Sequence, residues 1–362
     1  MKKLKQKYKN VIKKIFDTFY GPIKDSVKKS KDIKIYKIKI KKKNYNIFEV
    51  KNCRIYTDTI HDTAFIWKNR IVEGPSFQLR NYINSSIKEN IVFKKNTTRF
   101  LKKFNGNILS LLTGGGGNNN YFHWMFDVLP RIKIAQIKIN LNNINFFLVP
   151  NIDFDFQKTT LKLLGIYNKS ISSKKYRHIL SDKAIGTSHP WQITKSAKFD
   201  IEHLPKWISY WIRSKFIKLK SKKKFYPYIY IDRSDSKSNL SDKRKIINEI
   251  EIKNYLKKKR FKILKLSEYS FIDQISIFNS AKIIIGNHGA GFVNIIFCKK
   301  NTKIIEFISR YTPKMYRKIS KDLKLNYSSI KGSILGKDYK NQHSNIKVPI
   351  NILKKKLIKS FN

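Results

Sequence analysis

The spacing of hydrophobic and polar positions changes along the chain and marks out the predicted elements. In residues 1–20, apolar side chains recur every three or four positions, which predicts an amphipathic helix that Gly21 and Pro22 end. Residues 31–50 alternate lysine with isoleucine or tyrosine, and this period of two predicts a strand with one buried face. The apolar positions of the helix are Leu4, Tyr8, Val11, Ile12, Ile15, Phe16 and Phe19.

Strands and helices then alternate in the middle of the chain. An apolar strand at 107–113 is followed by a glycine turn at 114–117 and a helix at 121–129, which Asn118 to Asn120 can cap and Pro130 breaks or restarts. A second strand at 143–150 precedes a helix at 156–166 that ends at Gly165. This alternation predicts a parallel sheet.

The second half repeats the alternation more regularly, as an open, doubly wound α/β sheet does. Its predicted strands are 225–232, 261–266, 282–288 and 302–308, and its predicted helices are 241–259, 270–281 and 288–298. A tryptophan-rich helix and a lysine run within 200–224 mark a domain boundary. We therefore expect a basic helix at 1–22, an α/β domain at 23–212, a Rossmann-like domain at 213–330 and a basic tail at 331–362.

The charge is far from neutral, with 78 Lys and Arg against 24 Asp and Glu, a formal net of +54. Such a field attracts nucleic acid, anionic membrane or phosphorylated substrates. The abundance of Lys, Ile and Asn also fits an A/T-rich coding sequence, so both explanations stay open. The first helix fits an anionic membrane surface or packing on its own domain, and each could use a different face.

Two cysteines build no disulfide framework and form no CxxC pair for zinc. No stretch is apolar and long enough to span a bilayer, and the basic N-terminus lacks the apolar core of a signal peptide. We expect a cytoplasmic protein, with the inner membrane face as a candidate contact.

Ligands of open α/β sheets bind beyond the carboxyl ends of the strands. In the second half, Arg233, His288 and Glu306 fall there, with a glycine turn at 286–291. Gly289 and Gly291 permit close backbone approach, the next helix would aim N–H groups at an anion, and Arg233 can bind phosphate in a bidentate manner. With Arg244 these residues would form a diphosphate site without a metal. Each feature also has a structural explanation when it is taken singly. The glycine turn could be a tight strand-to-helix connection, Arg233 could form a surface salt bridge, and Arg244 could lie on a solvated helix face.

In the first half, His123 and Asp127 stand four residues apart on one predicted helix face. Such a pair can take a proton from an acceptor hydroxyl; we expect Asp127 as the base with His123 orienting it, although the roles could be exchanged or the pair purely structural. Asp153 and Asp155 form a D-x-D that resembles a metal motif, but acidic residues are common in turns. The glycine run at 114–117 does not match the dinucleotide-binding fingerprint, because Asn119 occupies the position of the third glycine.

Four segments between roughly residues 110 and 310 are similar, in order, to the motifs of the DUF563 proteins, glycosyltransferase family 61. They are NNNYFHWMFDVLPRI, YIYIDRSDSKSN with KRKIINE, the region FKILKLSEYSFIDQISIFNSAKIIIGNHGAGFVNIIFC, and TKIIEFI. The resemblance implies a GT-B-like α/β fold of two facing Rossmann-like domains with mostly parallel sheets. The first domain would then take the acceptor and the second the nucleotide-sugar.

The resemblance also implies an inverting transfer without a metal or other cofactor. It assigns the donor to Arg233, Arg244, Lys245, His288, Gly289, Ala290 and Gly291, with Asn294 ordering the turn and Glu306 meeting the nucleoside. The chain departs from the family pattern at Asp232, where serine is usual, and at Lys245, the second position of an arginine pair.

We therefore expect a hexosyl- or pentosyltransferase of surface polysaccharide or capsule synthesis, with a UDP-sugar as the favoured donor and a glycan or lipid-linked glycan as the acceptor. The alternative is a polyanion- or nucleic-acid-binding protein without activity; evenly spread lysines and the lack of a nucleic-acid motif oppose it. A dehydrogenase is opposed because the chain lacks the dinucleotide-binding glycine fingerprint. A degraded homologue would not be expected to keep His123, Asp127, Arg233 and His288 together.

Overall fold

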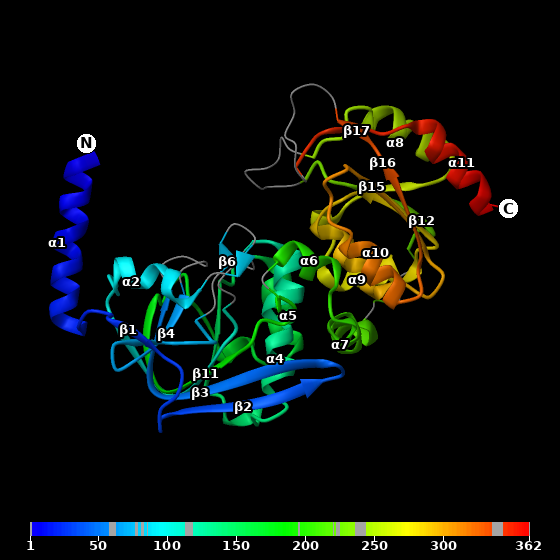
Figure 1. The fold of residues 1–362 in the computed structure, drawn as a ribbon. Helices are drawn as coiled ribbons and strands as arrows, with labels where there is room; N and C mark the ends of the chain where they lie inside the picture. The colour runs from blue at the N-terminus through cyan, green and yellow to red at the C-terminus, as the bar shows by residue number, and fades with distance from the viewer. Residues whose placement is uncertain are drawn as a thin grey trace. The chain divides into compact units, whose positions relative to one another are not determined.

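The computed structural model covers residues 1–362 and divides into two compact units, Met1–Asp200 and Ile201–Asn362 (Figure 1). It describes all residues except 1, 58–62, 77–78, 81–82, 85, 113–118, 195, 220, 222–224, 236–243, 335–342 and 362. The predicted glycine turn 114–117 thus lies outside the described residues. The sequence placed the boundary between 212 and 213, which falls inside α7 (Lys206–Phe216).

The first unit is built on a nine-stranded sheet in the order β1-β5-β4-β3-β11-β8-β9-β10, with β2 also paired to β3. Strands β11, β8, β9 and β10 are mutually parallel, and β2, β3, β4 and β5 form antiparallel pairs next to them. The strands are β1 (Asp25–Val27), β2 (Ile33–Ile40), β3 (Lys43–Thr57), β4 (Thr63–Trp67), β5 (Arg70–Val72), β8 (Lys102–Ser110), β9 (Phe146–Val149), β10 (Ser170–Ser172) and β11 (His178–Thr187). A short pair, β6 (Leu79–Arg80) and β7 (Ile83–Asn84), lies apart from this sheet.

The single strand predicted for 31–50 is wrong, because this segment is part of the antiparallel hairpin β2–β3. The alternation continues through both strands, and only the left-handed backbone of Lys41, with φ of 55°, marks the turn between them. Lysine is an unusual residue for that conformation, so no residue at this position signals a turn.

The helices of the first unit begin with α1 (Lys2–Tyr20), which ends before Gly21 as predicted. The others are η1 (Ile87–Glu89), α2 (Ile91–Lys95), α3 (Tyr121–His123), η2 (Trp124–Val128), α4 (Pro130–Ala135), η3 (Leu141–Asn143), α5 (Asp155–Leu163) and η4 (Tyr167–Lys169), while α6 (Ala197–Glu202) spans the division. Apolar side chains from β3, β4, β8, β9 and β11 form the core on one face of the sheet. No helix among the described residues is long and apolar enough to cross a membrane.

The second unit is a parallel five-stranded sheet in the order β13-β12-β14-β15-β16. Its strands are β12 (Tyr228–Asp232), β13 (Lys262–Lys265), β14 (Ile283–Asn287), β15 (Lys303–Ile308) and β16 (Asn326–Lys331). Its other helices are η5 (Ile217–Leu219), α8 (Glu249–Lys258), η6 (Leu266–Glu268), α9 (Phe271–Ser280), η7 (Ala290–Phe297), α10 (Met315–Asp322) and α11 (Ile350–Phe361). Figure 1 shows α8 and α11 on one side of this sheet and α9 and α10 on the other. The predicted α/β class is therefore confirmed.

The C-terminal residues complete this core rather than forming a separate tail. Strands β17 (Ser333–Ile334) and β18 (Ile346–Lys347) pair with each other, and Leu353 and Leu357 of α11 are buried with Tyr230 and Ile252. Helix α11 thus lies within the segment predicted as a basic tail. Its apolar residues, three or four positions apart, place it on the sheet.

Two predicted helix starts need correction. The helix expected from residue 241 begins at Glu249 as α8, because Arg244 has a left-handed backbone with φ of 62° and Ile246 bridges to Ile346. Arg244 therefore lies on the connection before α8 and not on its face. The helix after His288 is the 3₁₀-helix η7. Glu306 lies within β15, and the sheet has a further strand, β16, that the sequence pattern did not predict.

Candidate functional site

The helix that carries His123 and Asp127 changes its winding between them. Asn120 caps α3 by accepting the backbone N–H groups of Phe122 and His123. The next turn, η2, is a π-helix, and α4 restarts at Pro130, which needs no N–H bond there. Extra backbone in one turn is a feature that recurs at functional sites. The predicted restart at Pro130 is confirmed.

Both carboxylate oxygens of Asp127 accept hydrogen bonds inside the unit. Its Oδ2 lies 2.7 Å from Nδ1 of His123, and its Oδ1 accepts the indole N–H of Trp191. Nε2 of His189 lies 3.7 Å from Oδ2, and the guanidinium of Arg131 donates to the backbone carbonyl of Asp127 at 3.1 Å. Asp127 is 1% exposed and therefore buried, whereas the side chain of His123 is partly open to solvent.

The charges of this cluster follow from burial and pairing. Burial raises the pKa of Asp127, but the neighbouring His123 and His189 outweigh this and hold the pKa well below its ordinary value. Burial lowers the pKa of His123, but the Asp127 carboxylate outweighs it and the pKa is raised overall. An ionised carboxylate only accepts, so Nδ1 of His123 carries the proton and Nε2 presents a lone pair. No described residue binds that Nε2, and the side chain is 26% exposed.

Sequence reasoning missed His189 and Trp191 and gave Arg131 no role. His189 accepts the backbone N–H groups of Trp191 and Gln192 on Nδ1, which leaves its proton on Nε2, facing Asp127. Arg131 also donates to the carbonyl of Thr187 at 2.9 Å. Residues 188–191 directly follow β11 at the carboxyl edge of the parallel strands, and that position was the available signal.

In the second unit, Arg233 after β12, His288 after β14 and Glu306 within β15 meet near one edge of the sheet. Arg233 donates to the backbone carbonyl of His288 at 2.9 Å. Nδ1 of His288 lies 2.5 Å from Oε1 of Glu306, and the Tyr327 hydroxyl donates to Oε2 at 2.7 Å. Glu306 is 1% exposed and both its oxygens are bound, so it orients His288.

The charge around His288 includes both arginines. Burial lowers the pKa of His288, Glu306 opposes this, and the nearby Arg244 and Arg233 lower it further, so the pKa falls overall. Arg244 is thus close enough to act on this histidine although it is not on a helix. Asn287 holds it there by donating its side-chain N–H to the Arg244 carbonyl.

The turn after His288 brings backbone close to Arg233. A Cβ on Gly289 would lie 2.7 Å from Nε of Arg233, so a larger residue at this position would displace the guanidinium. A Cβ on Gly291 would meet Leu266 at 2.8 Å. The N–H groups of Ala290 and Gly291 open η7 and have no acceptor within it, which leaves them available to an anion.

The remaining predicted donor residues have structural partners. Asn294 donates to Oε1 of Gln274 at 2.9 Å and so ties η7 to α9. Lys245 is exposed, and its backbone N–H is bound by Asn345. Asp232, where the family usually has serine, forms an ion pair of 2.9 Å with Lys253. The charge of Lys253 offsets the negative charge of this carboxylate next to Arg233.

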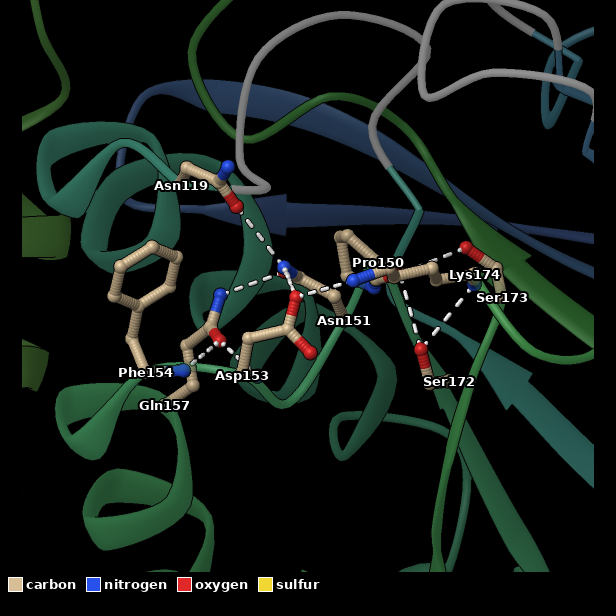
Figure 2. A network of polar contacts seen from close by, with 9 residues as sticks. All are labelled: Asn119, Pro150, Asn151, Asp153, Phe154, Gln157, Ser172, Ser173 and Lys174. Atoms are coloured by element: carbon tan, nitrogen blue, oxygen red, sulfur yellow. Dashed lines mark hydrogen bonds and ion pairs between the residues drawn. The ribbon is translucent and has the colours of Figure 1, made fainter. Parts of the chain in front are cut away.

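The D-x-D segment forms a turn stabilised by its own hydrogen bonds (Figure 2). Asp153 accepts from Lys174 at 2.8 Å and from Asn151 at 3.1 Å. Gln157 accepts the backbone N–H groups of Asp153 and Phe154 and donates to Asn151 at 2.7 Å. In the described part of the chain, no three His, Cys, Asp or Glu side chains gather as metal ligands would.

Asn151 extends this network to Asn119, the first described residue after the glycine turn. The bond, 3.0 Å long, links the segment that leads into α3 to the end of β9 (Figure 2). The turn therefore helps to place the helix that carries His123.

Comparison with known proteins gives one match. The model of the family described as glycosyltransferase 61 matches residues 121–305, which is more than half of the 362 residues and includes His123, Asp127, Arg233 and His288. No curated protein matches the chain. The match begins at the helix of His123 and Asp127 and ends in β15, one residue before Glu306. The chain therefore belongs to glycosyltransferase family 61.

Proposed function

We propose that this glycosyltransferase moves a sugar from a nucleoside diphosphate donor, with UDP-sugars favoured, to a hydroxyl of a glycan with inversion at the anomeric carbon. One observation carries the proposal: Arg233, His288 and the open N–H groups of Ala290 and Gly291 gather at the carboxyl edge of a parallel sheet. Cationic groups and helix N–H groups placed together bind a diphosphate.

His123 is the general base of the proposed reaction, and Asp127 positions it. This exchanges the two roles expected from the sequence. The reason is access: Asp127 is buried with both oxygens bound, whereas Nε2 of His123 has a lone pair and a partly exposed ring. The raised pKa of His123 makes it a better proton acceptor near neutral pH.

In the proposed step, Nε2 of His123 takes the proton of the acceptor hydroxyl as its oxygen attacks the anomeric carbon. The bond from that carbon to the diphosphate breaks, and the electron pair stays on the diphosphate oxygen. Arg233, Arg244 and the N–H groups of η7 stabilise the charge that develops there. In this proposal the arginines supply the positive charge that a metal supplies in other transferases.

We place the reaction in the cytoplasm and assign its product to a surface polysaccharide such as a capsule. Two free, buried cysteines, Cys53 and Cys298, suit a reducing compartment. The net charge of +54 suits an acceptor carried on a lipid pyrophosphate. The transferred unit is a hexose or a pentose.

Thermal unfolding with UDP, GDP, CMP, NAD or a short DNA duplex, in EDTA and at two salt concentrations, tests the donor site. Stabilisation by one nucleoside diphosphate that survives EDTA and salt is expected. Arg233→Ala should abolish the shift, whereas Lys257→Ala, which removes one exposed charge from α8, should keep it. Stabilisation by DNA alone, lost as salt rises, would instead show a polyanion-binding protein.

A further inference from the structure

Helix α1 has an apolar face that holds it to the first unit. Near its C-terminal end, the ring of Phe16 lies 5.2 Å from that of Phe100, and the ring of Tyr20 lies 4.9 Å from that of His178. The Tyr20 hydroxyl accepts the backbone N–H of Leu101 at 3.0 Å. Figure 1 shows α1 meeting the unit at this end and extending away from it toward the N-terminus.

A second apolar stripe on α1 is left open to solvent. Tyr8, Val11, Ile15 and Phe19 are spaced by three or four residues and are 69%, 50%, 50% and 69% exposed. Phe100, the partner of Phe16, is 81% exposed and adds an aromatic ring beside the helix. Scattered exposed apolar residues are normal, but a continuous stripe of large ones indicates a binding surface.

Lysines border one side of the stripe. By helical spacing, Lys7 and Lys14 fall on this flank and are exposed, whereas Lys13 falls on the side of Phe16 and Tyr20 and is partly buried. The helix has one acidic residue, Asp17, which accepts a hydrogen bond from Asn96 of the first unit. The open face is thus apolar along its centre and cationic along one edge.

We infer that this face of α1 is an anchor that lies in the surface of an anionic lipid bilayer. An apolar centre enters the acyl boundary while flanking lysines meet anionic headgroups. A second copy of the chain fits this face less well, because two such stripes would bring rows of lysines together on proteins of net charge +54. Nucleic acid would match the lysines but not the apolar centre.

The test is flotation of the full chain with vesicles of equal parts phosphatidylglycerol and phosphatidylcholine, and with vesicles of phosphatidylcholine alone. We expect binding to the anionic vesicles that weakens as salt rises. Val11→Asn with Ile15→Asn should reduce the binding at least about tenfold, because two inserted side chains are lost. Lys7→Gln with Lys14→Gln should reduce it by about fivefold for each charge.

The matched control is Asn10→Ser with Thr18→Asn, which changes two exposed polar positions of the same helix and should float like the unchanged chain. All these positions are exposed, so the thermal unfolding temperature checks that folding is kept. Equal flotation of the Val11/Ile15 variant and the control would overturn the inference in favour of diffuse charge attraction. If gel filtration showed a dimer that becomes a monomer in the Val11/Ile15 variant, the inference would be overturned, and the face would instead bind a second copy of the chain. Nucleotide binding is measured separately, so a failed donor site leaves this test unaffected.

Discussion

Replacing Asp127 by asparagine tests the proposed roles of the histidine–aspartate pair, because the two oxygens of this side chain both accept N–H groups. One faces Nδ1–H of His123 and the other faces the indole N–H of Trp191. An amide has one acceptor and one donor end, so either orientation sets its NH₂ against an N–H. The substitution is nearly the same shape, yet it cannot satisfy both partners.

The size of the effect follows from what is lost. One buried donor without an acceptor costs about 1–3 kcal/mol of stability. The loss of the carboxylate also removes the group that raises the pKa of His123, and a positioned base contributes about 10²–10⁴-fold to the rate. We therefore expect kcat to fall within that range while donor binding in the second unit stays unchanged.

The assay is the pH profile of kcat/KM for transfer, measured for the unchanged chain, Asp127→Asn and Asp182→Asn. Asp182 accepts the backbone N–H of Gly106 in an exposed hydrogen bond and belongs to neither site, so it serves as the control. The base must be deprotonated, so activity falls as pH drops through the raised pKa of His123, and this limb should move to lower pH in Asp127→Asn. Near-normal turnover, or an unmoved limb, would refute the assignment of His123 as the base.

Three further outcomes follow from single contacts. Trp191→Phe removes one donor to Asp127 and should lower kcat about tenfold, in steady-state assays where Trp67→Phe on β4 has no effect. Burial lowers the pKa of His178 to about 4. Since the unfolded chain takes up this proton at higher pH than the folded one, stability should fall by up to about 3 kcal/mol from pH 7 to pH 4, and urea unfolding of His178→Gln should lose this part of the slope. Finally, calorimetry should show UDP-sugar affinity rising by up to about tenfold per pH unit as the solution is acidified, and His288→Gln should remove that dependence.

The second sheet was predictable from the sequence because its strands are parallel and buried. Residues 283–285 are all isoleucine, every residue of β14 is buried, and helices of ordinary length separate such strands. The meeting of Arg233, His288 and Glu306 followed from one rule, that the carboxyl ends of parallel strands share an edge. No contact had to be known in advance.

The first unit was less predictable because its decisive contacts join distant segments. Trp191 reaches Asp127 across 64 positions of sequence, and no local pattern reports that bond. The burial of Asp127, which exchanges the expected roles, depends on the same contact. The left-handed backbones of Lys41 and Arg244 are likewise set by their surroundings, since neither residue type favours that conformation.

The two units use the same local arrangement to opposite effect. In each, a histidine holds a buried carboxylate through Nδ1 and leaves Nε2 without a partner among the described residues. The carboxylate raises the pKa of His123, whereas burial and two arginines lower that of His288.

Because Nδ1 of His288 is committed to Glu306, its Nε2 can donate to a phosphate only when the ring is protonated. A bound diphosphate supplies the negative charge that favours this proton, so donor binding should take up a proton. For His123 the neighbouring Asp127 carboxylate dominates, and no described cation lowers the pKa of this histidine, which keeps a lone pair for the acceptor hydroxyl in the proposed reaction. A shared pair geometry thus yields a base in one unit and an anion-dependent donor in the other, and the surrounding charge decides which.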